Sequence, residues 1–289
     1  MLEFTARYDF IDCPTPEEHR MAYWEWGDPN NREVLICVHG LTLNGRSFER
    51  LATVLSSHYR VICPDLVGRG NSDWLTEPKY YVWPTYFADL VYFLQQLNLH
   101  QVDWLGTSLG GVMGMFMAAE FPQQIKKLVL NDVGAFLSQK SLEKIANYLL
   151  FSPKEFSNLE LAENNLRSIY AGFGDLTDEQ WKQLLNISIV PDSDAGYRWH
   201  YDPQLAAPFA EQNGITSKDI ELWDTWSKVT CPTLLIHGEN SELLLPETIE
   251  KMQLDHSNLE VVHLPNIGHA PALMAEDQIL RVQNWLLNF

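Results

Sequence analysis

Short, continuous apolar runs recur along this chain, and they constrain its fold more than any other feature of the sequence. The runs are rich in valine, isoleucine and leucine, end in polar residues or glycine, and alternate with stretches of helical periodicity. Continuous apolar runs are typical of strands that are covered on both faces, and alternation with helices favours a parallel sheet. We therefore predict an α/β fold built on a mostly parallel, twisted sheet covered by helices. The predicted strands are 33–40, 59–65, 101–108, 125–132, 231–238 and 259–265.

The segments between and beside these runs complete the predicted layers. Residues 84–97, 110–121 and 275–289 have the pattern of helices that cover a sheet. Residues 5–11 and 21–27, "TARYDFI" and "MAYWEWG", indicate a hairpin that joins the edge of the sheet.

One long region breaks this rhythm. Between Gly134 and Ser227 the sequence shows no convincing buried strand; it indicates several short amphipathic helices and then the loop-rich stretch 190–209. We predict that residues 135–227 form a helical cap, or lid, inserted into a core of residues 1–134 and 228–289. Such an insertion can cover the carboxyl edge of the strands, where α/β sheets bind ligands, although a purely structural extension has the same pattern.

The charge of the chain limits its partners. The 289 residues carry a formal net charge of −18 and no Lys/Arg-rich stretch, which argues against nucleic acid and anionic membranes. Acidic residues stand where a signal peptide has a basic region, and no apolar run approaches the roughly 18 residues of a membrane helix. The four scattered cysteines include no CxxC pair, and no His-Glu-x-x-His spacing is present. We expect a cytoplasmic protein without metal or cofactor, of open oligomeric state.

Ser108 is the strongest candidate for a reactive side chain. It lies in a G-x-S-x-G pattern, between Gly106 and Gly110, directly after a predicted strand and directly before a predicted helix. A nucleophile elbow requires this context, because a sharp turn there lifts the serine above the sheet and the glycines allow close backbone approach. The pattern alone also occurs in Gly/Ser-rich loops, so its position between strand and helix carries the prediction.

A serine hydroxyl is a weak nucleophile and needs a base. His269 is the best candidate, because it lies in a loop after the last predicted strand and therefore at the same sheet edge as Ser108. His237 and His263 lie inside predicted strands and are expected to be core or surface residues.

The imidazole needs a carboxylate that fixes its tautomer, and the sequence offers two main candidates. Glu242 follows the predicted strand 231–238, and Asp132 ends the predicted strand 125–132. Both give the chain order Ser, acid, His, so order does not decide between them. Glu239 is a weaker third option, and Asp132 can equally cap a turn or support the histidine loop.

The carbonyl oxygen of a substrate becomes negative during attack and needs fixed donors. The backbone N–H of Leu109, directly after Ser108, is one expected donor. The second is expected from the loop after the predicted strand 33–40, at Leu41. His39 and Gly40 are expected to shape that loop rather than to react.

With these residues in view, the chain resembles the α/β-hydrolase superfamily over nearly its whole length. Many members of that superfamily carry G-x-x-S-D-x-L in the acid loop, and here Glu242 stands at the position of the Asp. The resemblance therefore favours Glu242 over Asp132, and it implies that residues 135–227 are the helical cap. The motifs that carry it are "HGLTLNG" (39–45), "DLVGRGNSD" (65–73), "GTSLGG" (106–111), "HGENSELL" (237–244) and "GHAP" (268–271).

Within that superfamily, the residues favour a serine hydrolase of carboxylic esters that works through an acyl-enzyme on a small or medium apolar substrate. Ser108 disfavours the members with an aspartate nucleophile, and Ala270 after His269 departs from carbon–carbon bond hydrolases, which often have Trp there. Carbon–carbon bond hydrolysis, thioester or lactone cleavage on the same triad remains the alternative. A non-catalytic ligand-binding protein is the second alternative. The aromatic cap residues Trp199, Tyr201 and Phe209 are candidates for substrate contact, although packing of cap against core is an equal possibility.

Overall fold

The computed structural model describes residues 6–192, 196–210 and 218–288, and a single large sheet organises them. Its strand order is β1-β2-β4-β3-β5-β6-β12-β13. All neighbouring pairs from β4 to β13 are parallel, so the predicted parallel sheet is confirmed. The strands that correspond to the apolar runs are β3 (Val34–Val38), β4 (Arg60–Pro64), β5 (Val102–Thr107), β6 (Ile125–Asn131), β12 (Thr233–Gly238) and β13 (Leu259–Leu264).

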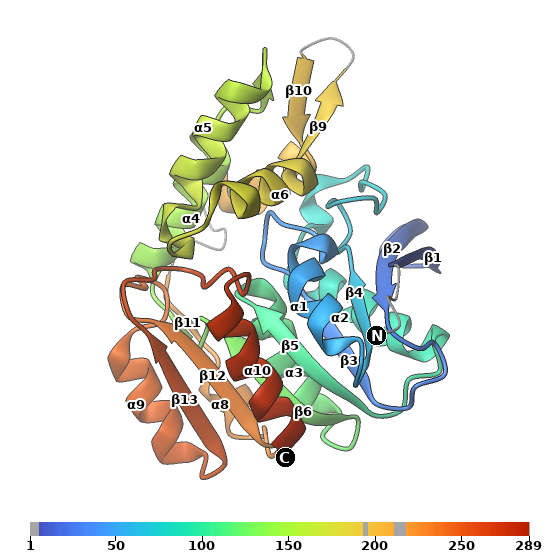
Figure 1. Ribbon diagram of the computed structural model, residues 1–289, viewed down its shortest axis with the longest axis vertical. Coiled ribbons are helices and arrows are strands. Elements are labelled where there is room, and N and C mark those ends of the chain that lie inside the picture. Colours follow the sequence, from blue (N-terminus) through green and yellow to red (C-terminus); the bar gives the residue numbers. More distant parts are fainter. Residues whose placement is uncertain (1–5, 193–195, 211–217, 289) are drawn as a thin grey trace.

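The predicted hairpin closes one edge of this sheet. Strands β1 (Arg7–Cys13) and β2 (His19–Trp26) pair antiparallel, and β2 continues antiparallel onto β4. The hairpin therefore extends the sheet at the end remote from β12 and β13, as Figure 1 shows.

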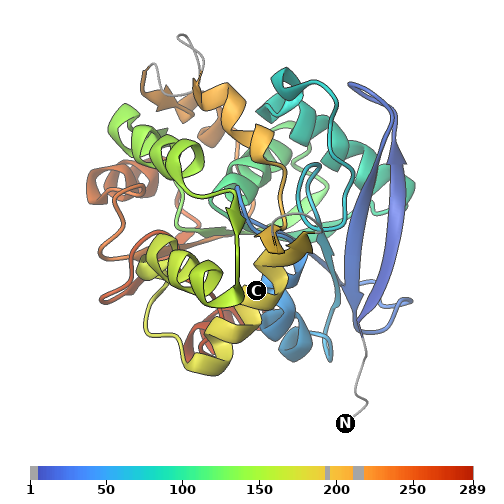
Figure 2. The same ribbon diagram turned by 90° about the horizontal axis from the view of Figure 1, so that it is seen from above.

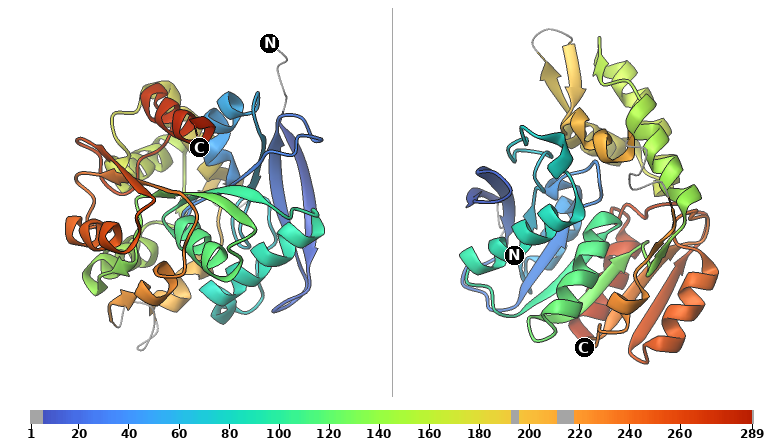
Figure 3. Two further views of the ribbon diagram at one scale, coloured as in Figure 1. Left: turned by 90° about the horizontal axis from the view of Figure 1, so that it is seen from below. Right: turned by 180° about the vertical axis from the view of Figure 1, so that it is seen from behind.

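Helices cover both faces of the sheet, which explains why a central strand such as β3 is apolar and buried along its whole length. Along β3, Leu35 and Cys37 pack into one apolar cluster, while Ile36 and Val38 pack into the other. The first cluster includes residues of α1 and α10, and the second includes residues of α2, α3, α8 and α9 (Figures 1 and 3). These helices are α1 (Glu49–Leu55), α2 (Trp83–Gln96), α3 (Leu109–Glu120), α8 (Trp223–Trp226), α9 (Pro246–Asp255) and α10 (Glu276–Asn288), with the 3-10 helices η1 (Gly45–Phe48) and η2 (Pro78–Tyr80) in the loops.

Residues 135–227, called the inserted segment below, lie between β6 and β12. Apart from α8, which packs beside α3, its labelled helices and a small sheet stand beyond the carboxyl ends of the large sheet's strands (Figures 1 and 2). The elements are β7 (Phe136–Leu137), α4 (Gln139–Phe151), β8 (Glu155–Phe156), α5 (Leu159–Ile169), η3 (Ala171–Phe173), α6 (Asp178–Ser188), β9 (Ile189–Asp192), β10 (Gly196–Trp199), η4 (Pro203–Ala206), α7 (Ala207–Ala210), β11 (Ile220–Glu221) and α8.

The inserted segment is less purely helical than the sequence predicts. Strands β8, β10 and β9 form a three-stranded sheet, and β11 pairs with β7. The stretch expected to be loop-rich therefore contains an antiparallel pair, whose strands are too short and too mixed in polarity for a buried-strand pattern.

Among the described residues, no helix is both long enough and apolar enough to cross a bilayer.

Candidate active site

Ser108 occupies a sharp turn between β5 and α3. Its φ of 51° and ψ of −113° lie outside the regions that side-chain-bearing residues usually adopt. Sterics require both flanking glycines: a Cβ on Gly106 would lie 2.1 Å from the carbonyl oxygen of Gly110, and a Cβ on Gly110 would lie 2.0 Å from that of Val38. The strand, the tight turn and the helix start thus have the predicted arrangement of a nucleophile elbow.

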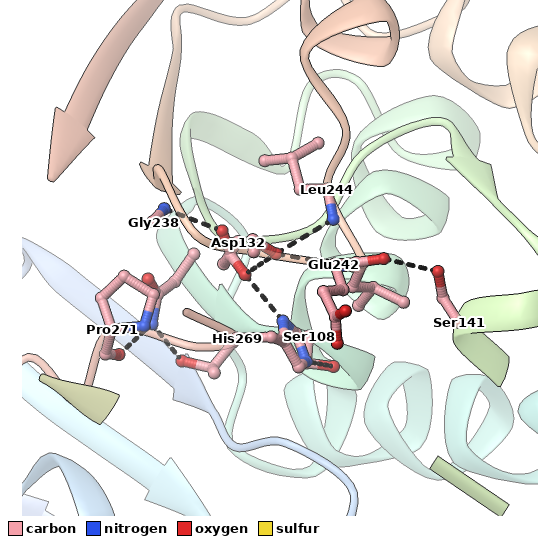
Figure 4. A network of polar contacts seen from close by, with 12 residues as sticks. Ser108, Asp132, Ser141, Gly238, Glu242, Leu244, His269 and Pro271 are labelled. Atoms are coloured by element: carbon pink, nitrogen blue, oxygen red, sulfur yellow. Dashed lines mark hydrogen bonds and ion pairs between the residues drawn. The ribbon is translucent and has the colours of Figure 1, made fainter. Parts of the chain in front are cut away.

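His269 connects Ser108 to a carboxylate. Its Nε2 lies 2.9 Å from Ser108 Oγ, and its Nδ1 lies 2.8 Å from Asp132 Oδ2 (Figure 4). The histidine comes from the loop between β13 and α10, and Asp132 directly follows β6 in a left-handed conformation with φ 57°. Three side chains from three strand ends therefore form one continuous hydrogen-bonded chain.

The carboxylate of Asp132 is buried and fully engaged. Its Oδ1 accepts from the backbone N–H of Gly238 at 2.9 Å, and its Oδ2 accepts from Ser241 Oγ at 2.6 Å as well as facing His269. The side chain has no exposed surface, whereas that of His269 is 24% exposed. Buried donors fix the direction of this carboxylate, so that it can orient the imidazole and balance an imidazolium charge.

Glu242 does not contact His269, which corrects the favoured prediction for the acid. Its side chain is 70% exposed and forms an ion pair with Lys144. That ion pair lowers the pKa of the Glu242 carboxyl. The backbone carbonyl of Glu242 accepts from Ser141 Oγ at 2.6 Å (Figure 4). In the same loop after β12, Ser241 Oγ donates to Asp132, while the Glu242 carboxylate is exposed.

The two backbone donors predicted for an oxyanion lie beside Ser108. Leu109 is the first residue of α3, so its N–H has no acceptor within the helix. Leu41 lies in the loop after β3 and borders the same cavity as Ser108, and Arg69 Nε donates to its carbonyl at 2.8 Å. Their role as oxyanion donors stays a prediction.

His39 holds the loop after β3 through hydrogen bonds to backbone atoms. Its Nδ1 donates to the carbonyl of Gly40 at 2.6 Å, and its Nε2 accepts from the N–H of Leu66 at 2.9 Å. Burial lowers the pKa of His39 to about 3, so the ring is neutral at pH 7. Both ring nitrogens are used by the backbone, as expected of a residue that shapes the loop.

Two cavities meet at Ser108 and Leu41. The first is bordered by His269 and by Thr42, Tyr148, Tyr170 and Phe173. The second is bordered by Trp83, Leu109, Val112, Val133, Phe209 and Leu243. The inserted segment contributes residues to both cavities, so its side chains share these cavities with Ser108.

The aromatic residues expected to touch substrate separate into two groups. Phe209 borders the second cavity, next to Ser108. Trp199 and Tyr201 border a different hollow with Trp74 and Arg198. Their rings stack with centroids 5.6 Å apart, and Trp199 Nε1 donates to the carbonyl of Pro153 at 2.9 Å. Both are almost fully buried and pack within the protein, so the substrate-contact prediction is corrected for these two residues.

Tyr148 and Tyr170 border the first cavity, and sequence reasoning did not identify them. Tyr148 lies on α4 and Tyr170 precedes η3, in a region where the sequence showed only helical periodicity. No motif marks such residues, because their position depends on how the inserted segment packs over the sheet.

One cluster in the described part of the chain has the donor types of a metal site. Cys13, His19 and Asp89 are buried, with their potential ligand atoms within 4.8 Å of one another. His19 Nδ1 donates to the carbonyl of Glu17 at 2.8 Å, and Nε2 lies 3.2 Å from Asp89 Oδ2. Burial opposes the charge of His19, but hydrogen bonds to Asp89 and Cys13 raise its pKa to about 10. A proton between His19 and Asp89 accounts for this arrangement, and none of the three residues borders the cavities at Ser108.

Comparison with known proteins identifies relatives over most of the chain. Residues 33–273 match the family model described as alpha/beta hydrolase fold. The chain is 42% identical over 281 residues to the 3-hydroxybutyrate-oligomer hydrolase of Cupriavidus necator. The aligned region covers 95% of this chain and 96% of that protein. It is 26% identical over 280 residues to Lipase 3 of a Moraxella species, and this alignment covers 89% of the chain and 77% of the lipase. The structure of an alpha/beta hydrolase from Novosphingobium aromaticivorans matches with a TM-score of 0.88, 32% identity and 100% coverage of both chains.

Proposed function

The chain belongs to the alpha/beta hydrolase fold family, and from this premise we propose that it is a serine hydrolase that cleaves carboxylic esters through an acyl-enzyme. Its relatives include a 3-hydroxybutyrate-oligomer hydrolase and a lipase, so the prediction of a hydrolase that acts on ester bonds is confirmed at the level of enzyme class. The observation that carries the mechanism is the unbroken series of contacts from Ser108 Oγ through His269 to Asp132.

In the proposed reaction, Ser108 Oγ attacks the ester carbonyl carbon while His269 Nε2 accepts the hydroxyl proton. Asp132 holds the His269 ring in the tautomer with a proton on Nδ1 and balances the positive charge that develops on it. The N–H groups of Leu41 and Leu109 are proposed to stabilise the oxyanion. His269 then gives its proton to the leaving alcohol, and a water molecule attacks the acyl-enzyme by the same steps in reverse.

We further propose that the inserted segment is a cap that shapes the substrate space. Support comes from the cavities at Ser108, since Tyr148, Tyr170 and Phe173 border one and Phe209 borders the other. The backbone of the segment is also tied to the histidine loop, because the N–H of Gly268 donates to the carbonyl of Gly172 at 2.7 Å. The proposed partner is a small-molecule ester, and the relative at 42% identity favours a short hydroxyacid oligomer.

Substitution of Ser108 tests this function directly. We expect Ser108→Ala to lower kcat for p-nitrophenyl butyrate by several orders of magnitude, as removal of the nucleophile does in other serine triads. The exposed Ser57, substituted by alanine, is the matched control and should keep wild-type turnover. Rapid mixing should also show a burst of p-nitrophenol and an added butyryl mass on the wild-type chain. Turnover by Ser108→Ala at the wild-type rate would refute the proposal, and ligand binding by wild type without any turnover would favour a non-catalytic protein.

A further inference from the structure

The first cavity at Ser108 has one polar wall among apolar surroundings. Thr42 Oγ1 lies 2.9 Å from Tyr170 OH and 3.5 Å from Tyr148 OH, and all three residues border the cavity. Much of the remaining lining is aliphatic or aromatic, and it includes Leu43, Ile169 and Phe173. Polar groups placed in an apolar pocket fix the orientation of a ligand and select for its chemistry.

The hydroxyl protons of this wall are not all used within it. Thr42, Tyr148 and Tyr170 bring one O–H donor each, and each contact between them uses one proton. Among the described residues these hydroxyls make only the two contacts above. One O–H donor is therefore left over beside Ser108, and a donor without an acceptor in an apolar setting is costly.

The charges around this wall specify which acceptor suits it. Apart from His269, no ionisable side chain other than the two tyrosines is found among the described residues that border the cavity. The Arg69 guanidinium acts on Tyr148 but does not border the cavity, and its Nε donates to the Leu41 carbonyl, so a substrate carboxylate would contact no arginine or lysine there. Burial raises the pKa of both Tyr148 and Tyr170, which keeps their hydroxyls protonated as donors at pH 7. A neutral oxygen, either a hydroxyl or an ester carbonyl, matches these donors.

The second cavity provides the contrast within the same site. Its border near Ser108 is formed by side chains such as Val112, Val133 and Leu243, and the described residues that line it carry no hydroxyl besides that of Ser108. The two cavities thus favour different halves of an ester. In a short hydroxyacid oligomer, the acyl half carries a neutral oxygen near the carbonyl, and the hydroxyl donors of the first cavity match it.

We infer that Thr42, Tyr148 and Tyr170 form a subsite that donates a hydrogen bond to a neutral oxygen on the acyl half, so that esters of short 3-hydroxyacids are preferred. This inference rests on the proposed ester hydrolysis at Ser108, and it adds the residues and the oxygen that decide between substrates. A site built to hydrogen-bond a substrate oxygen discriminates against the analogue that lacks it.

Paired esters that differ by one hydroxyl test the subsite. The measured quantity is the ratio of kcat/KM for p-nitrophenyl 3-hydroxybutyrate to that for p-nitrophenyl butyrate. We expect a variant with Thr42→Val, Tyr148→Phe and Tyr170→Phe together to lower this ratio about tenfold. A factor of this size lies near the upper end of what the loss of one hydrogen bond usually causes. Tyr92→Phe, on α2 and away from both cavities, is the matched control and should leave the ratio unchanged.

The outcomes separate a binding role from a structural one. If the triple variant does not fold, Tyr148→Phe and Tyr170→Phe are measured singly, and at least one should lower the ratio about threefold or more. Equal losses for both esters would mean that the hydroxyls only hold the inserted segment in place, and an unchanged ratio would overturn the inference. If wild type hydrolyses neither ester, the proposed function fails, and calorimetry with methyl 3-hydroxybutyrate and methyl butyrate then decides the subsite. Binding that depends on the substrate hydroxyl and is lost in the variants supports it, while equal binding of both esters overturns it.

Discussion

The strand ends of the large sheet and the inserted segment surround the same serine but are built differently. At the strand ends, Ser108 and Asp132 have positive φ angles, and buried hydrogen bonds fix Asp132 and His269. The inserted segment instead presents side chains from helix faces, such as Tyr148 and Phe209, which meet the cavities through packing and a few hydroxyl contacts. With the proposed function, this difference predicts that catalysis depends on the strand ends and substrate selectivity on the inserted segment, so variants in each part should affect different kinetic quantities.

After loss of Ser108 itself, the largest effect is expected from Asp132→Asn at the strand ends. An amide at this position cannot orient His269 in the same tautomer or balance the imidazolium, so kcat should fall by about 10⁴-fold for every ester. Steady-state kinetics on acetyl and hexanoyl esters measure it, with circular dichroism to establish that the variant is folded. A loss confined to one acyl length would contradict the separation of reaction from selectivity.

Lowering the pH should lower the free energy of unfolding, because His39 after β3 is buried as a neutral ring. Its pKa in the folded protein is about 3, below the value near 6.5 of an exposed histidine, so the neutral ring is the form that folding favours. The contribution of the neutral His39 ring to the free energy of unfolding is fully present above about pH 6.5. It is lost as the pH falls toward 3, by up to a few kcal/mol. Urea unfolding between pH 7 and pH 4 measures the slope, and His39→Gln, which cannot titrate there, should make the curve flatter. The same slope in both proteins would assign the acid sensitivity to other groups.

A smaller and more selective effect is expected from Phe209→Ala in the inserted segment. Removing this ring enlarges the apolar second cavity, which should raise KM for acetate esters of long-chain alcohols about tenfold or less and leave kcat for acetate esters of short alcohols nearly unchanged. Phe151→Ala is the matched control, since Phe151 belongs to the same segment and its side chain lies in solvent. An equal fall of kcat for all chain lengths would place Phe209 with the reaction rather than with selectivity.

The sequence predicted the strands and the turn at Ser108 because their constraints are local. The G-x-S-x-G pattern follows from the backbone at Ser108, whose flanking glycines have no room for a Cβ. The apolar runs follow from burial on both faces of the sheet. Tyr148 and Tyr170 could not be predicted in the same way, because nothing in a helical pattern tells which residues will face a cavity formed by distant segments.

Loop geometry also explains why the sequence favours Glu242 over Asp132 as the carboxylate partner of His269. The smallest expected effect on kcat/KM follows from this geometry. Asp132 and Glu242 both follow strands, and only the path of the loop after β12 separates them: Ser241 turns inward to Asp132 while the Glu242 carboxylate faces Lys144 in solvent. Glu242→Gln removes only that exposed ion pair, so kcat/KM should change less than about twofold, and stability should change little because surface ion pairs contribute little. Parallel assays with Asp132→Asn, on the same ester and at the same pH, measure the contrast. A large loss in Glu242→Gln would mean that Glu242 rather than Asp132 serves His269 during turnover, and it would place the determinant of the reaction outside the buried strand ends.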